Sequence, residues 1–119
     1  MGLDQNWMIK TPDDFDHPYE SIAYHRKFNA LEGFMANIWH RDHEDEFNCC
    51  YLHITNEILD ELEATVKDGK LVPTSGFFFG KTEMDEYYKA EVKELLEEII
   101  PKVRKLLAQD KIIYYTSWW

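Results

Sequence analysis

The residues best suited to binding chemistry stand close together in segment 24–29, which reads Tyr-His-Arg-Lys-Phe-Asn. Arginine presents a planar fork that matches phosphate oxygens, lysine adds a point charge, and asparagine can hydrogen-bond a base edge or a ribose. In the helix that the spacing predicts here, Tyr24 and Lys27 share one face, and so do Arg26 and Asn29. The segment is therefore a candidate anion-binding surface, although a solvated polar helix face would have the same composition.

A second candidate is segment 75–80, Ser-Gly-Phe-Phe-Phe-Gly. Its glycines free the backbone to aim N–H groups at an oxygen ligand, and phenylalanine faces can stack on a base. The spacing is neither that of a dinucleotide fingerprint nor that of a P-loop. The alternative is a buried segment whose aromatic rings fill the core. The candidate ligand residues are Ser75, Gly76, Phe77, Phe78 and Phe79.

The third candidate is segment 114–119, Tyr-Tyr-Thr-Ser-Trp-Trp. Alternation along a strand would separate Tyr115 and Ser117 from Tyr114 and Trp118. So many aromatic side chains favour either a subunit interface or a stacking platform, with Tyr115 and Trp118 as candidate ligand contacts. Packing of one face against a helix is the alternative.

The other reactive residues lack the spacing of a catalytic or metal site. His40 and His43 do not form the H-E-x-x-H pattern, and the acidic run 42–46 lacks the alternation and the glycine of a calcium loop. Cys49 and Cys50 have no spacer for zinc and would point to opposite faces of a strand, so we expect both to be reduced. A dyad of either cysteine with His53 would be poorly placed along one strand. We therefore expect no enzymatic activity, no metal and no cofactor.

Composition limits the partners and the compartment. The chain has 119 residues and a mass of 14.3 kDa, with 23 acidic and 13 basic residues and a formal net charge of -10. This charge disfavours binding to DNA or RNA polymers. A small anionic ligand is still possible, because two or three cations at one place suffice and salt screens charges beyond about 8 Å. No apolar run is long enough for a membrane span, and the cysteine usage predicts a cytosolic protein.

The apolar spacing predicts a single domain over residues 1–119. We expect the α+β class, with three main helices packed on a small sheet of two to three strands. Helices are expected over 19–40, from a Thr55 cap to Gly69, and over 83–109, with a kink near Pro101. Strands are expected around 7–9, 47–54 and 111–118. The first helix carries the anion-binding candidate and also Trp39.

These segments together resemble a widespread family of small tailed-phage proteins. The resemblance covers about residues 19–118. Its most specific part is the S-G-F-F-F-G segment, and the second is the R-K-x-N segment. The other matching positions are Tyr24, Leu31, Trp39, Asn48, Cys49, Tyr87, Tyr88, Tyr114, Tyr115, Ser117 and Trp118.

The family is similar to the viral nucleotide sponges that defeat CBASS or Thoeris immunity in the bacterial cytoplasm. Such proteins sequester a cyclic nucleotide messenger without cleaving it, and the founding type is a homotetramer. The resemblance implies that Arg26 and Lys27 meet phosphate, while Trp39, Phe77–Phe79, Tyr115 or Trp118 stack on bases.

Two residues depart from the family pattern, because His25 stands where many members have Trp, and Glu32 where many have His. These departures leave the identity of the ligand open. The competing hypothesis is an acidic protein that binds and inhibits a host nucleic-acid-interacting enzyme through the acidic clusters 42–46 and 57–63.

Overall fold

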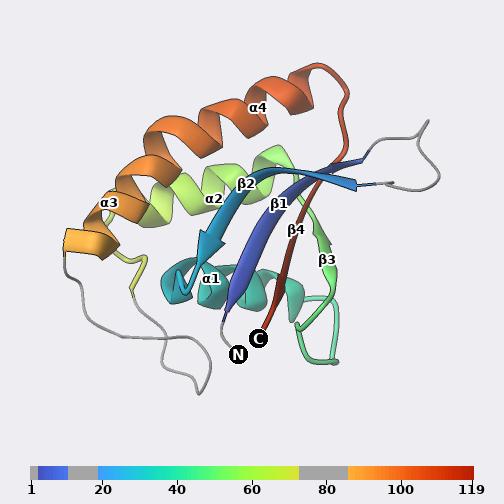
Figure 1. The fold of residues 1–119 in the computed structure, drawn as a ribbon, viewed down its shortest axis with the longest axis horizontal. Helices are drawn as coiled ribbons and strands as arrows, with labels where there is room; N and C mark the ends of the chain where they lie inside the picture. The colour runs from blue at the N-terminus through green and yellow to red at the C-terminus, as the bar shows by residue number, and fades with distance from the viewer. Residues whose placement is uncertain (1–2, 11–18, 73–85) are drawn as a thin grey trace.

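The computed structural model describes residues 3–10, 19–72 and 86–119 (Figure 1). Three helical units pack on a sheet, which confirms the α+β class. Along the chain, the elements are β1 (Asp4–Lys10), β2 (Tyr19–Arg26), α1 (Asn29–Trp39), β3 (Tyr51–His53), α2 (Asn56–Lys67), α3 (Glu86–Glu94), the π-helical turn η1 (Leu95–Ile99), α4 (Ile100–Ala108) and β4 (Ile113–Trp118). The segment 75–80, which carries the second candidate site, lies outside the described residues.

The sheet has four strands in the order β2-β1-β4-β3, and every neighbouring pair is antiparallel. The prediction of two to three strands was therefore too low. Strand β1 lies between β2, the next strand along the chain, and β4, the last strand. This arrangement brings residues near position 25 and residues near position 117 to the two sides of β1.

The additional strand is β2, and the prediction of a helix over 19–40 was wrong for its first part. Burial alternates along the end of β2, where His25 is buried between exposed Tyr24 and Arg26. Lys27 then has φ of 60°, in the left-handed region that no right-handed helix contains. The polar interruption at Arg26-Lys27 is thus the boundary between a strand and helix α1, which begins at Asn29.

The strand predicted over 47–54 is shorter in the structure, where it covers Tyr51–His53. Cys49 has φ of 61°, so the extended conformation is interrupted there. The Cys49 backbone N–H nevertheless donates to the carbonyl oxygen of Ser117 at 2.8 Å. The segment before β3 therefore stays attached to the end of β4.

The two later helical units follow the predicted boundaries where the structure describes them, and the start predicted at residue 83 lies outside the described residues. Thr55 caps α2, since its Oγ1 accepts the Ile58 backbone N–H at 3.3 Å. Segments α3, η1 and α4 follow one another as a single helical run. The sequence predicts a kink near Pro101, and the structure has a π-helical turn over Leu95–Ile99 just before it. There, the Ile100 N–H bonds to the carbonyl oxygen of Leu95, five residues earlier, and Pro101 has no N–H to continue the α-helical pattern.

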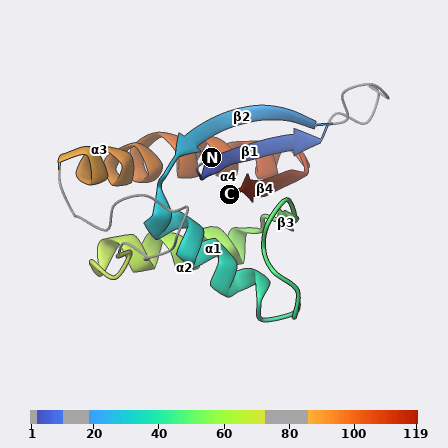
Figure 2. The same cartoon turned by 60° about the horizontal axis from the view of Figure 1, so that its bottom comes forward.

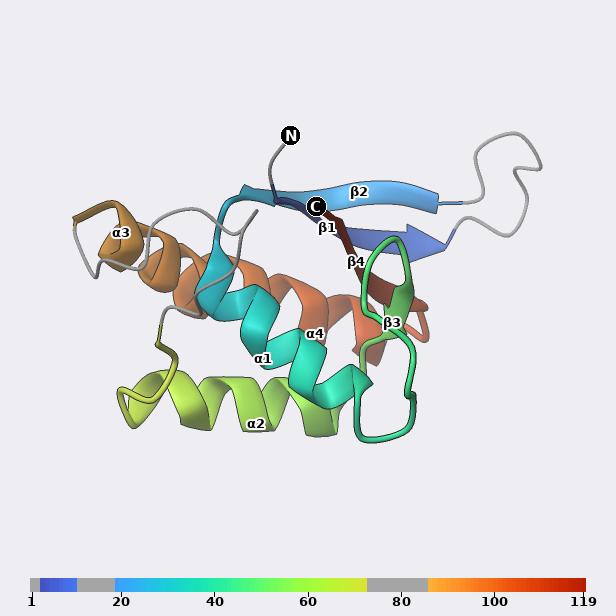
Figure 3. The same ribbon diagram turned by 90° about the horizontal axis from the view of Figure 1, so that it is seen from below.

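The helices lie on one side of the sheet (Figures 2 and 3). Trp7 and Tyr115 are fully buried at the centre of this covered face, with ring centroids 5.5 Å apart in an edge-to-face contact. No described helix covers the opposite face of the four strands, which we call the open face. No helix in the described ranges is long and apolar enough to cross a membrane.

Candidate functional site

Register across the sheet assembles a row of three side chains on the open face. Asp4 of β1 pairs with Arg26 on one side and with Trp118 on the other. Directly paired residues in antiparallel strands point to the same face. Arg26 and Trp118, which are far apart in the sequence, therefore flank one carboxylate.

Asp4 also fixes the exposed aromatic side chains beside it. Its Oδ1 accepts the Tyr24 hydroxyl, and its Oδ2 accepts the Trp118 indole N–H at 3.0 Å. Tyr24 and Trp118 have 52% and 60% of their surface exposed, an unusual amount for large aromatic residues held by hydrogen bonds. We call the group of Asp4, Tyr24, Arg26 and Trp118 the Asp4 cluster.

The electrostatics of the Asp4 cluster keep it in one protonation state near neutral pH. The Tyr24 hydrogen bond lowers the pKa of Asp4, and the Trp118 hydrogen bond and the charge of Arg26 lower it further. The same hydrogen bond to Asp4 raises the pKa of Tyr24. Asp4 is therefore ionised and Tyr24 is protonated, which is the combination that the hydrogen bonds require.

The next row along the open face is Tyr24, Asn6, Thr116 and Tyr51, from β2 to β3. Ser21 Oγ donates to Asn6 Oδ1 at 2.8 Å. The Asn6 amide nitrogen donates no hydrogen bond to a described residue. This row thus offers hydrogen-bonding groups between aromatic residues at its two ends.

A tyrosine cluster follows at the far end of the open face. Tyr19 lies with its ring centroid 4.8 Å from that of Tyr51 and 5.7 Å from that of Tyr114. His53 lies 5.5 Å from Tyr114. The face is thus aromatic along its length.

Charge on the open face differs from charge on the molecule as a whole. The register places one acidic residue, Asp4, and two basic residues, Arg26 and Lys10, on the open face of the described strands. Lys27 follows directly in the turn and is exposed. A chain of net charge -10 therefore presents a face with a small excess of positive charge.

The structure divides the predicted ligand residues into three groups. Tyr24, Arg26 and Trp118 come together in the Asp4 cluster, with Lys27 beside them. The predicted sharing of a helix face by Tyr24 and Lys27 was wrong, because the segment is a strand and a turn. The interior holds Asn29, Trp39 and Tyr115, and the described ranges do not include Ser75, Gly76, Phe77, Phe78 and Phe79.

Trp39 and Tyr115 pack in the core instead of facing a ligand. The Trp39 ring stacks on His43 at 3.6 Å, and its indole N–H donates to the carbonyl oxygen of Asp45. Tyr115 is fully buried, and its hydroxyl donates to Glu32 and accepts from Gln5, both at 2.8 Å. These contacts give both aromatic rings a structural role.

His25 and Glu32, at which the sequence departs from the phage-protein pattern that it resembles, are both buried in polar networks. Glu32 accepts hydrogen bonds from the hydroxyls of Tyr115 and Ser117, each at 2.8 Å. Burial raises the pKa of Glu32, although these two hydrogen bonds lower it in part. The carboxyl of Glu32 therefore joins α1 to β4 beneath the sheet.

His25 joins β2 to α3 and is poorly placed to act as a general base. Its Nε2 accepts the Trp7 indole N–H at 3.1 Å, so Nδ1 carries the proton and donates to Glu91 Oε2 at 3.1 Å. Both ring nitrogens are occupied and the side chain is buried. In the described ranges, no three His, Cys, Asp or Glu side chains are grouped so that they could hold a metal ion.

The sequence patterns missed Asp4, Asn6 and Tyr51 as members of the open face. Burial alternates at the start of β1, where Gln5 and Trp7 are buried and Asp4 and Asn6 are partly exposed, but the residue types hide this alternation because Gln5 is polar. The face on which Asp4 and Asn6 lie therefore follows from the pairing of β1 with β2 and β4.

Comparison with protein families, curated proteins and solved structures finds no match for this chain. The resemblance to phage nucleotide sponges therefore enters the functional argument as a hypothesis. The open face and the Asp4 cluster are the observations against which it is weighed.

Proposed function

We propose that the protein binds a cyclic nucleotide messenger on the open face and sequesters it without cleavage, which would block anti-phage signalling in the host. The observation that carries the proposal is the Asp4 cluster, in which one carboxylate holds two exposed aromatic side chains beside Arg26. Stacking on such side chains contributes about 1–3 kcal/mol per base in single-strand binding proteins. A charge-assisted hydrogen bond to phosphate adds about 1.5–3 kcal/mol.

The distribution of charge supports the same ligand class. An anionic ligand meets less repulsion on the open face than over the acidic remainder of the chain, since salt screens charges that lie farther away than about 8 Å. Asp4 does not present a free carboxylate, because both of its oxygens accept hydrogen bonds from aromatic residues. Arg26 and Lys27 supply the positive charge beside the cluster, and the ionised Asp4 opposes part of their attraction for a phosphate.

The acidic-inhibitor hypothesis has less support in the described residues. In the acidic cluster 57–63, Glu61 pairs with Arg41, Asp60 pairs with Arg104, and Glu63 pairs with Arg104 and Lys67. These acids are therefore partly neutralised within the fold. A surface that imitates nucleic acid needs unpaired negative charge.

The test is capture and release. The protein is incubated with a panel of cyclic di- and trinucleotides, separated from free ligand, heat-denatured, and the supernatant is analysed by chromatography. We expect at least one nucleotide to be retained and then released intact. Release of a cleaved product would indicate an enzyme, and failure to retain any nucleotide would contradict the proposal.

A further inference from the structure

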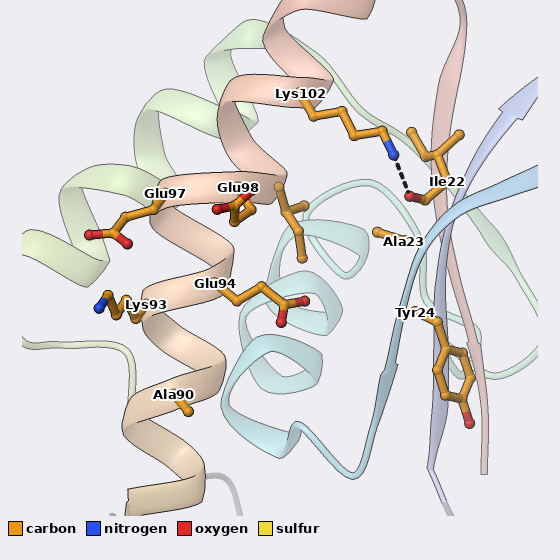
Figure 4. A pocket seen from close by; sticks show the side chains of 10 residues that line it. Ile22, Ala23, Tyr24, Ala90, Lys93, Glu94, Glu97, Glu98 and Lys102 are labelled. Carbon is orange, nitrogen blue, oxygen red and sulfur yellow. Dashed lines mark hydrogen bonds between the residues drawn. The ribbon is translucent and has the colours of Figure 1, made fainter.

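A groove runs between β2 and the long helix α3–η1–α4 (Figure 4). Its volume is about 620 Å³, within the range of clefts that hold ligands or peptides. Ile22 and Ala23 of β2 form one wall, and Ala90 and Ile99 lie on the helix side. We call this cleft the edge groove, because β2 is the outermost strand of the sheet.

The backbone of β2 turns hydrogen-bonding groups toward the edge groove. The Lys27 N–H donates to the carbonyl oxygen of Leu3 at 2.8 Å, which continues the register of β1 and β2. In an antiparallel pair, hydrogen-bonded and non-hydrogen-bonded residues alternate. The backbone N–H and C=O of His25 therefore point toward β1. Those of Tyr24 and Arg26 point away from β1, toward the free edge of the sheet.

One position on this edge already accepts a donor from outside the sheet. Ile22 is the additional residue at a register shift, since Trp7 pairs with Ala23 and Met8 pairs with Ser21. Its carbonyl oxygen accepts the Lys102 ammonium at 2.8 Å, and Figure 4 shows this bond crossing the groove. A lysine at a strand edge protects against unspecific pairing. It also shows that an N–H donor fits at this position.

Charge in the edge groove selects among partners. Three acidic residues and two basic residues line the edge groove, namely Glu94, Glu97, Glu98, Lys93 and Lys102. Glu94 extends from the helix into the space beside β2 (Figure 4). Neither Glu94 nor Glu98 forms an ion pair with a described residue, in contrast to Asp60, Glu61 and Glu63 of α2. A second copy of this acidic chain would bring more negative charge, whereas a basic segment would be attracted.

We propose that the edge groove binds an extended basic segment of a partner protein, which adds to β2 as a fifth strand. Strand addition uses backbone hydrogen bonds for affinity and alternate side chains for specificity. At about 3.4 Å per residue, five residues span about 17 Å and follow β2 from Ile22 to Arg26. Basic side chains on the helix side of the added strand meet Glu94 and Glu98. The proposal uses the backbone of Tyr24 and is independent of nucleotide binding by its ring.

The experiment uses the full chain and a fluorescein-labelled octapeptide of alternating lysine and valine, with binding followed by fluorescence anisotropy in 0.15 M salt. Two further peptides carry N-methyl groups on the odd or the even amides. Strand addition needs the N–H groups on one side of the peptide, so we expect one methylated peptide to bind at least tenfold more weakly than the other. Equal affinities would mean unspecific attraction of a polycation and would overturn the proposal, as would absence of binding at 1 mM peptide.

Protein variants separate the two walls of the groove. Glu94→Gln combined with Glu98→Gln should weaken binding of the unmodified octapeptide at least threefold, whereas Glu57→Gln on α2 should leave it unchanged. Lys102→Ala frees the Ile22 carbonyl oxygen and should bind the peptide more tightly than Lys105→Ala, which removes the same charge from an exposed position. The edge groove would not be the binding site if the Glu94/Glu98 double variant and Glu57→Gln bound the peptide equally well. Equal affinities of Lys102→Ala and Lys105→Ala would contradict it too.

Discussion

At the scale of single residues, Asp4 determines how the open face is presented. Its carboxylate is the acceptor for both Tyr24 and Trp118, which would otherwise be free to change rotamer. Two ordered aromatic rings lose less conformational entropy on binding than two mobile ones. Asp4 therefore helps to order the aromatic side chains of the site, although its own negative charge disfavours binding of an anionic ligand.

Arg26 is the residue whose loss should affect the ligand more than the fold. Its side chain is exposed, so Arg26→Ala should change the free energy of unfolding by no more than about 0.5 kcal/mol. Loss of a charge-assisted phosphate contact should weaken binding by about 1.5–3 kcal/mol. Calorimetry with the nucleotide retained in the capture assay measures the affinity, and Lys111→Ala serves as the control. Unchanged affinity, or a melting temperature that falls together with it, would contradict the assignment.

The raised pKa of Glu32 predicts that the stability of the fold depends on pH. Burial raises its pKa in the folded state above the ordinary value of 4.5. A carboxyl of this kind stabilises the fold fully below its unfolded pKa, and the contribution is lost as the pH rises through the folded pKa. The free energy of unfolding of the parent minus that of Glu32→Gln should therefore decrease as the pH rises above about 4.5. Urea denaturation at a series of pH values tests this, and a difference that increases with pH would refute it.

At the scale of elements, α2 offers a test of a boundary that the sequence predicted correctly. Thr55→Ala removes the acceptor for the Ile58 N–H and should destabilise the protein by about 1 kcal/mol, whereas Thr55→Ser keeps the oxygen and should cost less. Thermal or urea unfolding of the two variants provides the comparison. Equal stability of Thr55→Ala and the parent would show that the cap contributes nothing.

The elements with strong local signals could be predicted from the sequence, and β2 could not. Thr55 acts through its hydroxyl, and Gly69 and Pro101 act through their own backbones, so these local effects appear at the expected places. Strand β2 depends on pairing with β1, which is a tertiary interaction that overrides local propensity. Residues such as Ile22 and Ala23 fit a helical stripe with Ala30 equally well, and only the polar break at Arg26-Lys27 indicated otherwise.

The same distinction applies to the candidate site. Tyr24, Arg26 and Trp118 could be selected by residue type, and alternation correctly predicted that Tyr115 and Trp118 face opposite ways. The role of Asp4 could not be predicted, because it arises from the register of β1 with both of its neighbours. Burial of Asn29 and Trp39 likewise depends on how α1 packs, which residue type does not reveal.

At the scale of the whole molecule, the open face is aromatic and poor in acids on a chain of net charge -10. Exposed aromatic side chains such as Tyr24, Tyr51 and Trp118 favour association with another surface. We therefore expect a homo-oligomer, which would also allow a ligand to be enclosed between subunits. Sedimentation should give a multiple of 14.3 kDa at micromolar concentration. A mass near that of one chain would contradict this expectation.

The most direct test of the central claim is the indole N–H resonance of Trp118 during titration with the retained cyclic nucleotide. Trp118→Phe assigns the resonance in a ¹H–¹⁵N spectrum. We predict a saturable shift of the Trp118 signal, with the buried indoles of Trp7 and Trp39 nearly unchanged. A nucleotide that binds with the expected affinity but leaves the Trp118 resonance in place would show that the open face at Asp4 is not its site.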